Sequence, residues 1–168
     1  MAGVKPHSAS AIDDRHALRF DSSEQELFLN LWRTYDRLRM LEDELFREFD
    51  LTPQQYNVLR LLGALAPESM PTLVIADRLV SRAPDISRML DKLEKRGYVT
   101  RSRPPENRRQ VLVALAPAGE SLLDQIAEPL RNCHQRQLGH LSGEERSQLV
   151  TLLQHARRPH ESEASCWR

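Results

Sequence analysis

One change in the spacing of apolar residues constrains the fold of this chain more than any other feature of its sequence. Over residues 22–96 and 117–156, apolar side chains recur every three or four positions, which is the period of an amphipathic helix. Residues 98–103 instead follow the alternating period of a strand, residues 110–115 are predicted as the return strand, and the polar residues 104–109 lie between them. The sequence therefore predicts a mainly α fold with one small β-hairpin.

Local start signals divide the first helical stretch. Ser23 followed by Glu26 fits a capping box, in which two side chains satisfy free N–H groups at a helix start. We therefore expect the first helix to begin near Ser22 and Ser23. Thr52 as N-cap, Pro53 at the first helical position and Gln55 three residues after the cap predict a second helix start.

Two short helices are predicted between residues 72 and 97. The first is capped by Thr72. Its inward-facing side chains are predicted to be Leu73, Ala76, Leu79 and Val80. The second begins at Ser81, tolerates Pro84 because N–H groups in a first helical turn lack intrahelical partners, and ends at Gly97.

The helices after the hairpin carry signals of their own. Pro117 opens a helix in which Pro129 is expected to produce a kink or a break, because proline removes a helical hydrogen bond. Ser142 with Glu145 forms a further capping box, which starts the last helix.

Charge is unevenly distributed along a chain whose net charge is zero, with 24 basic and 24 acidic residues. Residues 71–116 contain ten Lys or Arg and five Asp or Glu, a net charge of +5. Residues 21–50 contain four and nine, a net charge of −5. Such a division presents a basic face to a polyanion and keeps the acidic part away from it. It favours nucleic acid as the partner of residues 71–116.

The basic part has the order of a helix-turn-helix followed by a basic hairpin. In that arrangement the second short helix enters the major groove of double-stranded DNA, and a thin hairpin inserts arginine into the minor groove. Arg88 is a candidate for pairing with guanine, and Ser87 for a base or a phosphate. Asp85 either accepts from a cytosine amine or only favours the helix start. The candidate DNA-binding residues are Arg82, Pro84, Asp85, Ser87, Arg88 and Lys92 on the helix, and Arg103, Asn107, Arg108 and Arg109 on the hairpin.

Four segments in this order resemble the MarR (multiple antibiotic resistance regulator) family of winged helix-turn-helix transcription factors. Residues 81–99 resemble its recognition helix and the following strand, and residues 105–109 with 111–113 resemble its wing. Residues 51–56 resemble the start of its second helix, and residues 115–119 its strand-to-helix junction.

The resemblance implies a homodimer, in which residues 22–50 and 117–156 form N- and C-terminal dimerisation helices and residues 51–116 form the winged helix-turn-helix. It also implies a palindromic operator and a repressor that responds to a small-molecule effector. Residues 1–21 are then a flexible N-terminal arm, and residues 157–168 a frayed C-terminal tail. Two alternatives stay open: a winged-helix protein-interaction module, and a transcriptional activator without a small-molecule ligand.

Two positions depart from the family pattern. The wing usually carries Asp two residues before its Arg, and this chain has Asn107 before Arg109; an amide binds a guanidinium more weakly than a carboxylate does. The family favours Thr before the helix that follows the wing, and this chain has Ala116. Since a lost cap oxygen typically costs about 1 kcal/mol, we expect a weaker helix start and no change of fold.

Three aromatic residues, Trp32, Tyr35 and Tyr56, are candidates for lining a small-molecule pocket. Ordinary packing in the core or at a dimer interface also accounts for them. Cys133 and Cys166 match neither a disulfide framework nor a common zinc-ligand spacing, so no metal and no cofactor are predicted, and a redox-sensing thiol is left open.

Signatures of other protein classes are missing from the sequence. It has no Gly-rich phosphate loop, no His-Glu-x-x-His and no Gly-x-Ser-x-Gly, so we predict no enzyme activity. Because no apolar run approaches the roughly 18 residues of a membrane span, and the N-terminus has no apolar signal core, we expect a cytoplasmic protein without membrane contact.

Overall fold

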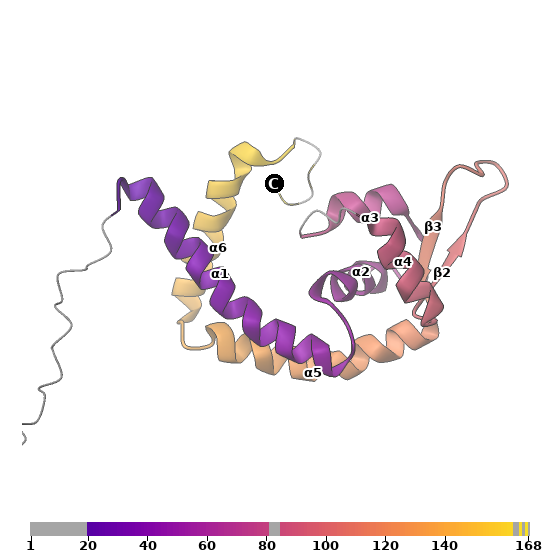
Figure 1. The fold of residues 1–168 in the computed structure, drawn as a ribbon, viewed down its shortest axis with the longest axis horizontal. Helices are drawn as coiled ribbons and strands as arrows, with labels where there is room; N and C mark the ends of the chain where they lie inside the picture. Colours follow the sequence, from indigo (N-terminus) through magenta and orange to yellow (C-terminus); the bar gives the residue numbers. More distant parts are fainter. Residues whose placement is uncertain (1–19, 81–84, 163–164, 166, 168) are drawn as a thin grey trace, which may run out of the picture. The chain divides into compact units, whose positions relative to one another are not determined.

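A computed structural model describes residues 20–80, 85–162, 165 and 167 (Figure 1). The chain divides into two compact units, Met1–Arg37 and Leu38–Arg168, and helix α1 runs through the boundary between them. The described helices are α1 (Ser23–Glu48), α2 (Pro53–Gly63), α3 (Thr72–Arg78), α4 (Ile86–Lys95), α5 (Pro117–Leu138), α6 (Gly143–Arg157) and the 3-10 turn η1 (Arg158–His160). The described strands are β1 (Met70–Pro71), β2 (Val99–Ser102) and β3 (Leu112–Leu115).

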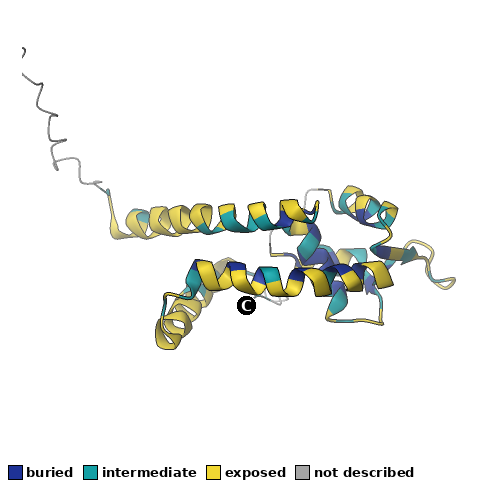
Figure 2. Cartoon of the chain, turned by 90° about the horizontal axis from the view of Figure 1, so that it is seen from below, coloured by how far each residue is buried: buried dark blue, intermediate teal, exposed yellow. Residues whose placement is uncertain are grey.

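Helix α1 begins at Ser23, within the predicted start near Ser22 and Ser23, but its capping residues differ from the predicted ones. The Ser22 hydroxyl accepts from the backbone N–H of Gln25 at 3.2 Å, and the Gln25 side-chain oxygen accepts from the N–H of Asp21 at 2.7 Å. The predicted capping box of Ser23 and Glu26 is therefore wrong, because Ser23 is already a helical residue. Large apolar side chains are exposed along the part of α1 in the first unit (Figure 2): Leu27, Phe28, Leu31, Trp32 and Tyr35.

The hydrophobic core lies in the second unit, where α2, α3, α4, α5 and the sheet contribute buried residues (Figure 2). Helix α2 begins as predicted, with Pro53 in its first turn and a capping box in which Thr52 and Gln55 satisfy each other's backbone N–H groups. The residues with an exposed fraction of 2% or less are Phe46, Val58, Leu59, Leu62, Met70, Ile75, Leu90, Leu93, Val99, Val113 and Ile126. Full burial of one such side chain stabilises the fold by about 1.5–3 kcal/mol.

The predicted β-hairpin is present as β2 and β3, which pair antiparallel with Val99 opposite Leu115. A third strand, β1, pairs with the other edge of β3, so the order is β1-β3-β2. Strand β1 was not predicted from the sequence, because a two-residue strand carries no period of its own. Thr72 continues this pairing: both its N–H and its hydroxyl donate to the Val111 carbonyl, at 3.0 and 3.3 Å.

Helix α3 shows two corrections. Thr72 does not cap the helix, since Pro71 occupies the N-cap position and the Thr72 hydroxyl is bound to the Val111 carbonyl. Leu73 and Val80 do not face inward, with exposed fractions of 84% and 68%. Leu79 is buried as predicted, and Ile75, which was not predicted to face inward, is buried as well, because their four-residue separation places them on one face of the helix.

Helix α4 begins later than predicted. Its N-cap is Asp85, whose backbone is non-helical (φ −138°) and whose carboxylate accepts from the Arg88 N–H at 3.0 Å. The predicted start at Ser81 and first-turn position of Pro84 lie outside the described residues. The end of α4 is as predicted: Gly97 has φ +74°, the left-handed conformation that glycine adopts without steric cost, and its N–H donates to the Glu94 carbonyl at 2.8 Å.

Helix α5 continues through Pro129, so of the kink or break expected there, the break does not occur. Its N-cap, Ala116, makes no side-chain cap bond, because alanine has no side-chain acceptor. Gly119 lies so close to the residue before β2 that a Cβ there would meet the Tyr98 carbonyl oxygen at 2.3 Å, so the junction needs glycine. Helix α6 begins with the predicted capping box of Ser142 and Glu145.

Part of the C-terminal segment is ordered against α3, which the prediction of a frayed tail did not include. The Trp167 indole N–H donates to the Arg78 carbonyl at 3.2 Å, and Arg157 Nε donates to the Trp167 carbonyl at 2.9 Å. These contacts join residues 89 and 10 positions apart, so no helical or strand period indicates them. No helix within the described residues is long and apolar enough to cross a membrane.

Candidate nucleic-acid interface

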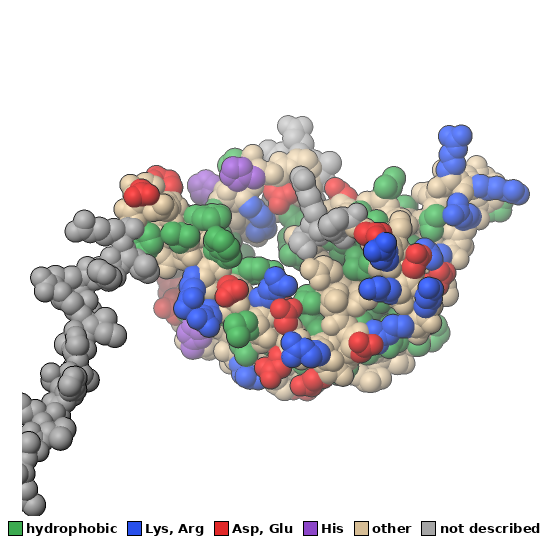
Figure 3. Space-filling view, in the orientation of Figure 1, with side chains coloured by type: hydrophobic (Ala, Val, Ile, Leu, Met, Phe, Trp, Pro, Cys, Tyr) green, Lys and Arg blue, Asp and Glu red, His purple; other side chains and the backbone are tan. Residues whose placement is uncertain are grey.

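Two basic elements of the second unit present side chains to solvent. Lys and Arg side chains gather over α4 and over the loop between β2 and β3, whereas acidic residues are interspersed among them at α4 (Figure 3). Helix α3 precedes α4, and the hairpin follows it, so the order is a helix-turn-helix with a hairpin wing.

The N-terminal half of α4 carries the predicted reading residues Asp85, Ser87 and Arg88, all of them exposed. Asp85 uses both carboxylate oxygens within the helix: one accepts from the Arg88 backbone N–H, and the other lies 3.1 Å from Arg88 Nε. The geometry therefore favours the second role considered for Asp85, a helix start. The Arg88 side chain is 77% exposed despite this ion pair. Lys92 is exposed one turn further along the helix, and the candidates Arg82 and Pro84 lie outside the described residues.

The root of the wing is fixed to α4 by a residue that sequence reasoning did not single out. Arg101 on β2 donates through Nε to the Glu94 carboxylate at 2.8 Å, and its Nη2 lies 2.6 Å from the Asp91 carboxylate. The hydrogen bond to Glu94 raises the pKa of Arg101 above its ordinary value. This arginine contributes to the positive charge count, but its guanidinium is engaged with α4 and holds β2 against that helix.

The tip of the wing is an exposed loop that carries Arg103, Asn107, Arg108 and Arg109. Arg103 spans the loop, since its Nη1 donates to the Arg108 carbonyl at 3.0 Å. Asn107 shapes the loop through its backbone, whose carbonyl accepts from the Gln110 N–H at 3.0 Å. No hydrogen bond joins the described Asn107 and Arg109 side chains, in line with the weaker support expected from an amide at position 107.

The three candidate pocket aromatics have different surroundings in their own units. In the first unit, Trp32 and Tyr35 are 62% and 59% exposed, and the Trp32 ring lies 6.1 Å from the Phe28 ring. In the second unit, Tyr56 stacks on Phe46 with ring centroids 4.8 Å apart, and burial raises the pKa of its hydroxyl. Tyr56 is thus a packing residue of the core edge.

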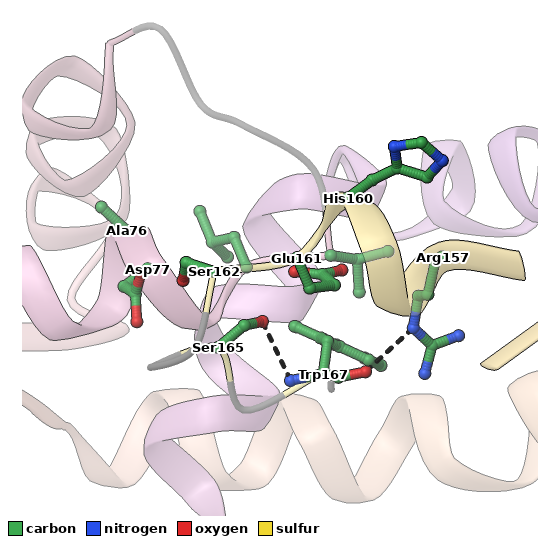
Figure 4. Close-up of a pocket in the computed structure, with 10 residues that line it drawn as sticks. Ala76, Asp77, Arg157, His160, Glu161, Ser162, Ser165 and Trp167 are labelled. Atoms are coloured by element: carbon green, nitrogen blue, oxygen red, sulfur yellow. Dashed lines mark hydrogen bonds between the residues drawn. The ribbon is translucent and has the colours of Figure 1, made fainter. Parts of the chain in front are cut away.

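The C-terminal segment and α3 enclose a cavity of about 590 Å³ (Figure 4). Arg157, His160 and Trp167 line one side, and Asp77 of α3 lies opposite them. The Arg157 guanidinium lies 5.8 Å from the Trp167 ring centre. The lining mixes charges of both signs, and the sequence did not predict it because residues 157–168 carry no periodic pattern.

The described residues give no indication of a metal site or of a reactive thiol. No cluster of three or more potential metal ligands occurs there. Cys133 is buried in α5, and its burial raises the pKa of the thiol, which disfavours the reactive thiolate. Cys166 lies outside the described residues.

The geometry defines a class: a winged helix-turn-helix DNA-binding protein, with a capped recognition helix and a basic wing. A family model described as "MarR family" matches residues 51–111. A MarR transcription factor from Planctomyces limnophilus is 56% identical, with 80% of this chain and 98% of that chain covered and a TM-score of 0.65. The chain belongs to the MarR family.

Two further solved structures are similar across most of both chains. Escherichia coli MarR, as a cysteine-to-serine mutant complexed with operator DNA, is 25% identical over 78% of this chain and 93% of that chain, with a TM-score of 0.70. Bordetella bronchiseptica BpsR, whose DNA binding is regulated by 6-hydroxynicotinic acid, is 25% identical over 83% and 98%, with a TM-score of 0.72. The family and fold predictions are thereby confirmed: this is a MarR-family transcriptional regulator and not an enzyme.

Proposed function

We propose that this regulator is a homodimeric repressor that binds a palindromic operator and releases it in response to a small-molecule effector. The observation that supports DNA binding is the exposure of Arg88 and Lys92 on α4. The start of α4 is capped by Asp85, and β2, which follows α4, is held against it by Arg101. A preorganised helix loses little conformational entropy on entering the major groove.

The proposed contacts divide between the two basic elements. Arg88 and Ser87 contact base edges in the major groove, and Lys92 contacts phosphate. Arg108 and Arg109 at the wing tip enter the flanking minor groove, where a narrow groove concentrates negative potential. Arg103 holds the wing loop through its bond to the Arg108 carbonyl.

Apolar surface that the single chain leaves exposed supports the proposed homodimer. In the first unit this surface is the α1 stripe around Phe28 and Trp32, and in the second unit it lies on α6, where Val150 and Leu152 are 53% and 65% exposed. Large exposed apolar patches on a polar protein mark interaction sites, and a two-fold dimer suits a palindromic half-site arrangement. Residues 22–50 and 117–156 are the proposed dimerisation segments.

The effector is proposed by analogy with the regulation of BpsR by 6-hydroxynicotinic acid. Trp32 and Tyr35 are the candidate effector contacts that remain from the sequence, since Tyr56 packs on Phe46. A screen of aromatic carboxylic acids, with 6-hydroxynicotinic acid as the first probe, would measure release of bound DNA. A ligand shifts the protein away from its DNA-competent state only by its differential affinity for the two states.

The experiment that tests this function is fluorescence anisotropy of the full chain against duplex DNA from its own upstream region. Tight binding that prefers this DNA over a scrambled duplex and weakens with salt supports a sequence-specific regulator. Equal binding of both duplexes at modest salt contradicts an operator in that region and favours the protein-interaction alternative. A reporter gene under the same upstream region then separates repression from activation.

A further inference from the structure

Arg96, at the C-terminal end of α4, bonds several residues of the second unit through its side chain and is not one of the proposed DNA contacts. Arg96 is the C-cap residue of α4, directly before Gly97, and its side chain is only 28% exposed. Its guanidinium reaches away from α4 to the end of α1, 46 residues earlier in the chain. The residue thus connects the end of the recognition helix to the end of another helix.

The bonds at the α1 end go to the carbonyls of the two residues that directly follow the helix. Nη1 of Arg96 donates to the Asp50 carbonyl, and Nη2 donates to the Phe49 carbonyl at 3.3 Å. The last carbonyls of a helix lack intrahelical partners and carry partial negative charge, so a cation there is stabilising. Asp50 follows the helix with a positive φ of 52° and adds its carboxylate 3.5 Å from Nη1.

Arg96 also contacts Tyr98, the residue directly before β2. Nη2 of Arg96 also donates to the Tyr98 hydroxyl at 3.3 Å, and the guanidinium carbon lies 4.8 Å from the centre of the Tyr98 ring. Tyr98 in turn accepts the Ala116 N–H on its carbonyl at 3.0 Å, at the junction of β3 with α5. One planar group with five donors therefore ties together the ends of α1 and α4 and the start of β2.

The same geometry places Arg96 away from the proposed base contacts. At 1.5 Å per residue, the separation of eight positions from Arg88 to Arg96 corresponds to about 12 Å along the helix axis. The guanidinium is engaged with backbone carbonyls at the end of α1 and with Tyr98. Arg96 is therefore suited to hold α4 in position and not to contact bases.

We propose that Arg96 is a positioning residue that sets the direction of α4 relative to the C-terminal end of α1, and thereby the half-site spacing that the dimer accepts. This inference rests on the proposed function, because spacing has meaning only for a dimer on DNA. Without the guanidinium, the side chains of Ser87 and Arg88 are still present on α4, but α4 can adopt several orientations relative to the end of α1. Only a fraction of molecules then holds both recognition helices at the required separation.

The first test measures spacing preference with the full chain. The variant Arg96→Met keeps an unbranched apolar stem and removes all donors. The probes are the upstream duplex bound by the wild type and two versions with one base pair added to or removed from its centre. If the competent population falls to about a tenth, the apparent Kd for the native spacing rises about tenfold, and the penalty for altered spacing shrinks.

Two comparisons separate positioning from other roles. The slope of log affinity against log salt stays at the wild-type value for Arg96→Met, whereas loss of a phosphate contact lowers the slope by about 0.9. Lys95→Met is the matched control, since it removes an adjacent exposed cation at the same helix end. We expect Lys95→Met to keep the wild-type spacing preference, and Arg96→Lys, which retains part of the hydrogen bonding, to fall between wild type and Arg96→Met.

A second measurement needs no DNA. In hydrogen exchange, the amides of Leu51 and Tyr98, which donate to the Phe46 and Leu93 carbonyls, exchange faster in Arg96→Met than in wild type or Lys95→Met. The amide of Ile126, in the middle of α5, keeps its protection. Unchanged exchange at Leu51 and Tyr98 overturns the inference, as does an unchanged spacing preference. Failure of the wild type to prefer its upstream DNA counts instead against the proposed function, and the exchange result still decides the role of Arg96.

Discussion

The two basic elements of the interface are held in opposite ways. Helix α4 is fixed at its start by Asp85, along its side by Arg101 and at its end by Arg96. The wing tip is held by one side-chain bond across the loop, from Arg103 to the Arg108 carbonyl, and by turn hydrogen bonds. The difference indicates that α4 meets DNA in a preformed position, whereas the wing tip adapts to the groove that it enters.

Truncating the core beneath α4 should have the largest effect. Leu93 is fully buried, so Leu93→Ala is expected to lower the free energy of unfolding by about 2–5 kcal/mol. Leu73, 84% exposed on α3, is the matched control, and Leu73→Ala should change stability by less than about 0.5 kcal/mol. Urea denaturation measures both variants. Equal losses would mean that α4 is not anchored in the core as described.

Removing a wing-tip arginine should affect DNA binding and leave the fold intact. Arg109→Ala is expected to weaken operator binding by about 3 kcal/mol, with the midpoint of unfolding and the dimer on sizing unchanged. Anisotropy against the upstream duplex measures the affinity. Undiminished binding would remove Arg109 from the interface and with it the assignment of the loop as a wing.

Removing Arg88 should reduce the preference for one DNA sequence over another more than it reduces the overall affinity for DNA. Arg88→Ala is expected to cost about 1–2 kcal/mol on the preferred sequence and much less on scrambled DNA, because a base contact carries sequence information. A competition titration with both duplexes measures the ratio. An equal loss on both sequences would make Arg88 a phosphate contact.

Weakening the start of α4 should give the smallest of these effects. Asp85→Ala removes the cap oxygen from the Arg88 N–H and is expected to lower stability by about 1 kcal/mol. Asp85→Asn keeps a good cap but loses the charge beside Arg88, so its stability should stay near the wild-type value. Thermal unfolding of the two variants separates capping from the ion pair. Equal destabilisation of both would assign the effect to the charge.

The sequence predicted those helix ends and strands that depend on residues close together in the chain. Thr52 with Gln55 predicted the start of α2, Gly97 predicted the end of α4, and the alternation of residues 98–103, followed by a polar turn and a return strand, predicted the hairpin. These features depend on residues only a few positions apart, so a single sequence carries them. The exposed candidates on α4 and on the wing were found for the same reason, because they follow recognisable elements.

The missed features depend on contacts between distant residues. Strand β1 exists because Met70 and Pro71 pair with β3, and Leu73 is exposed because the core lies on the face of Ile75. The bonds from Arg96 to the end of α1 and from Trp167 to Arg78 span 46 and 89 residues. Spacing within one helix cannot indicate such partners, so these contacts emerged only with the fold.

Hydroxyl-radical footprinting of the full chain on its upstream duplex tests the central claim most directly. We predict a symmetric pattern: two recognition sites centred about one helical turn, roughly 10–10.5 base pairs, apart, flanked by minor-groove protection that disappears in Arg109→Ala. A single unpaired footprint, or flanking protection that persists in Arg109→Ala, would contradict a dimer reading DNA through α4 and the wing.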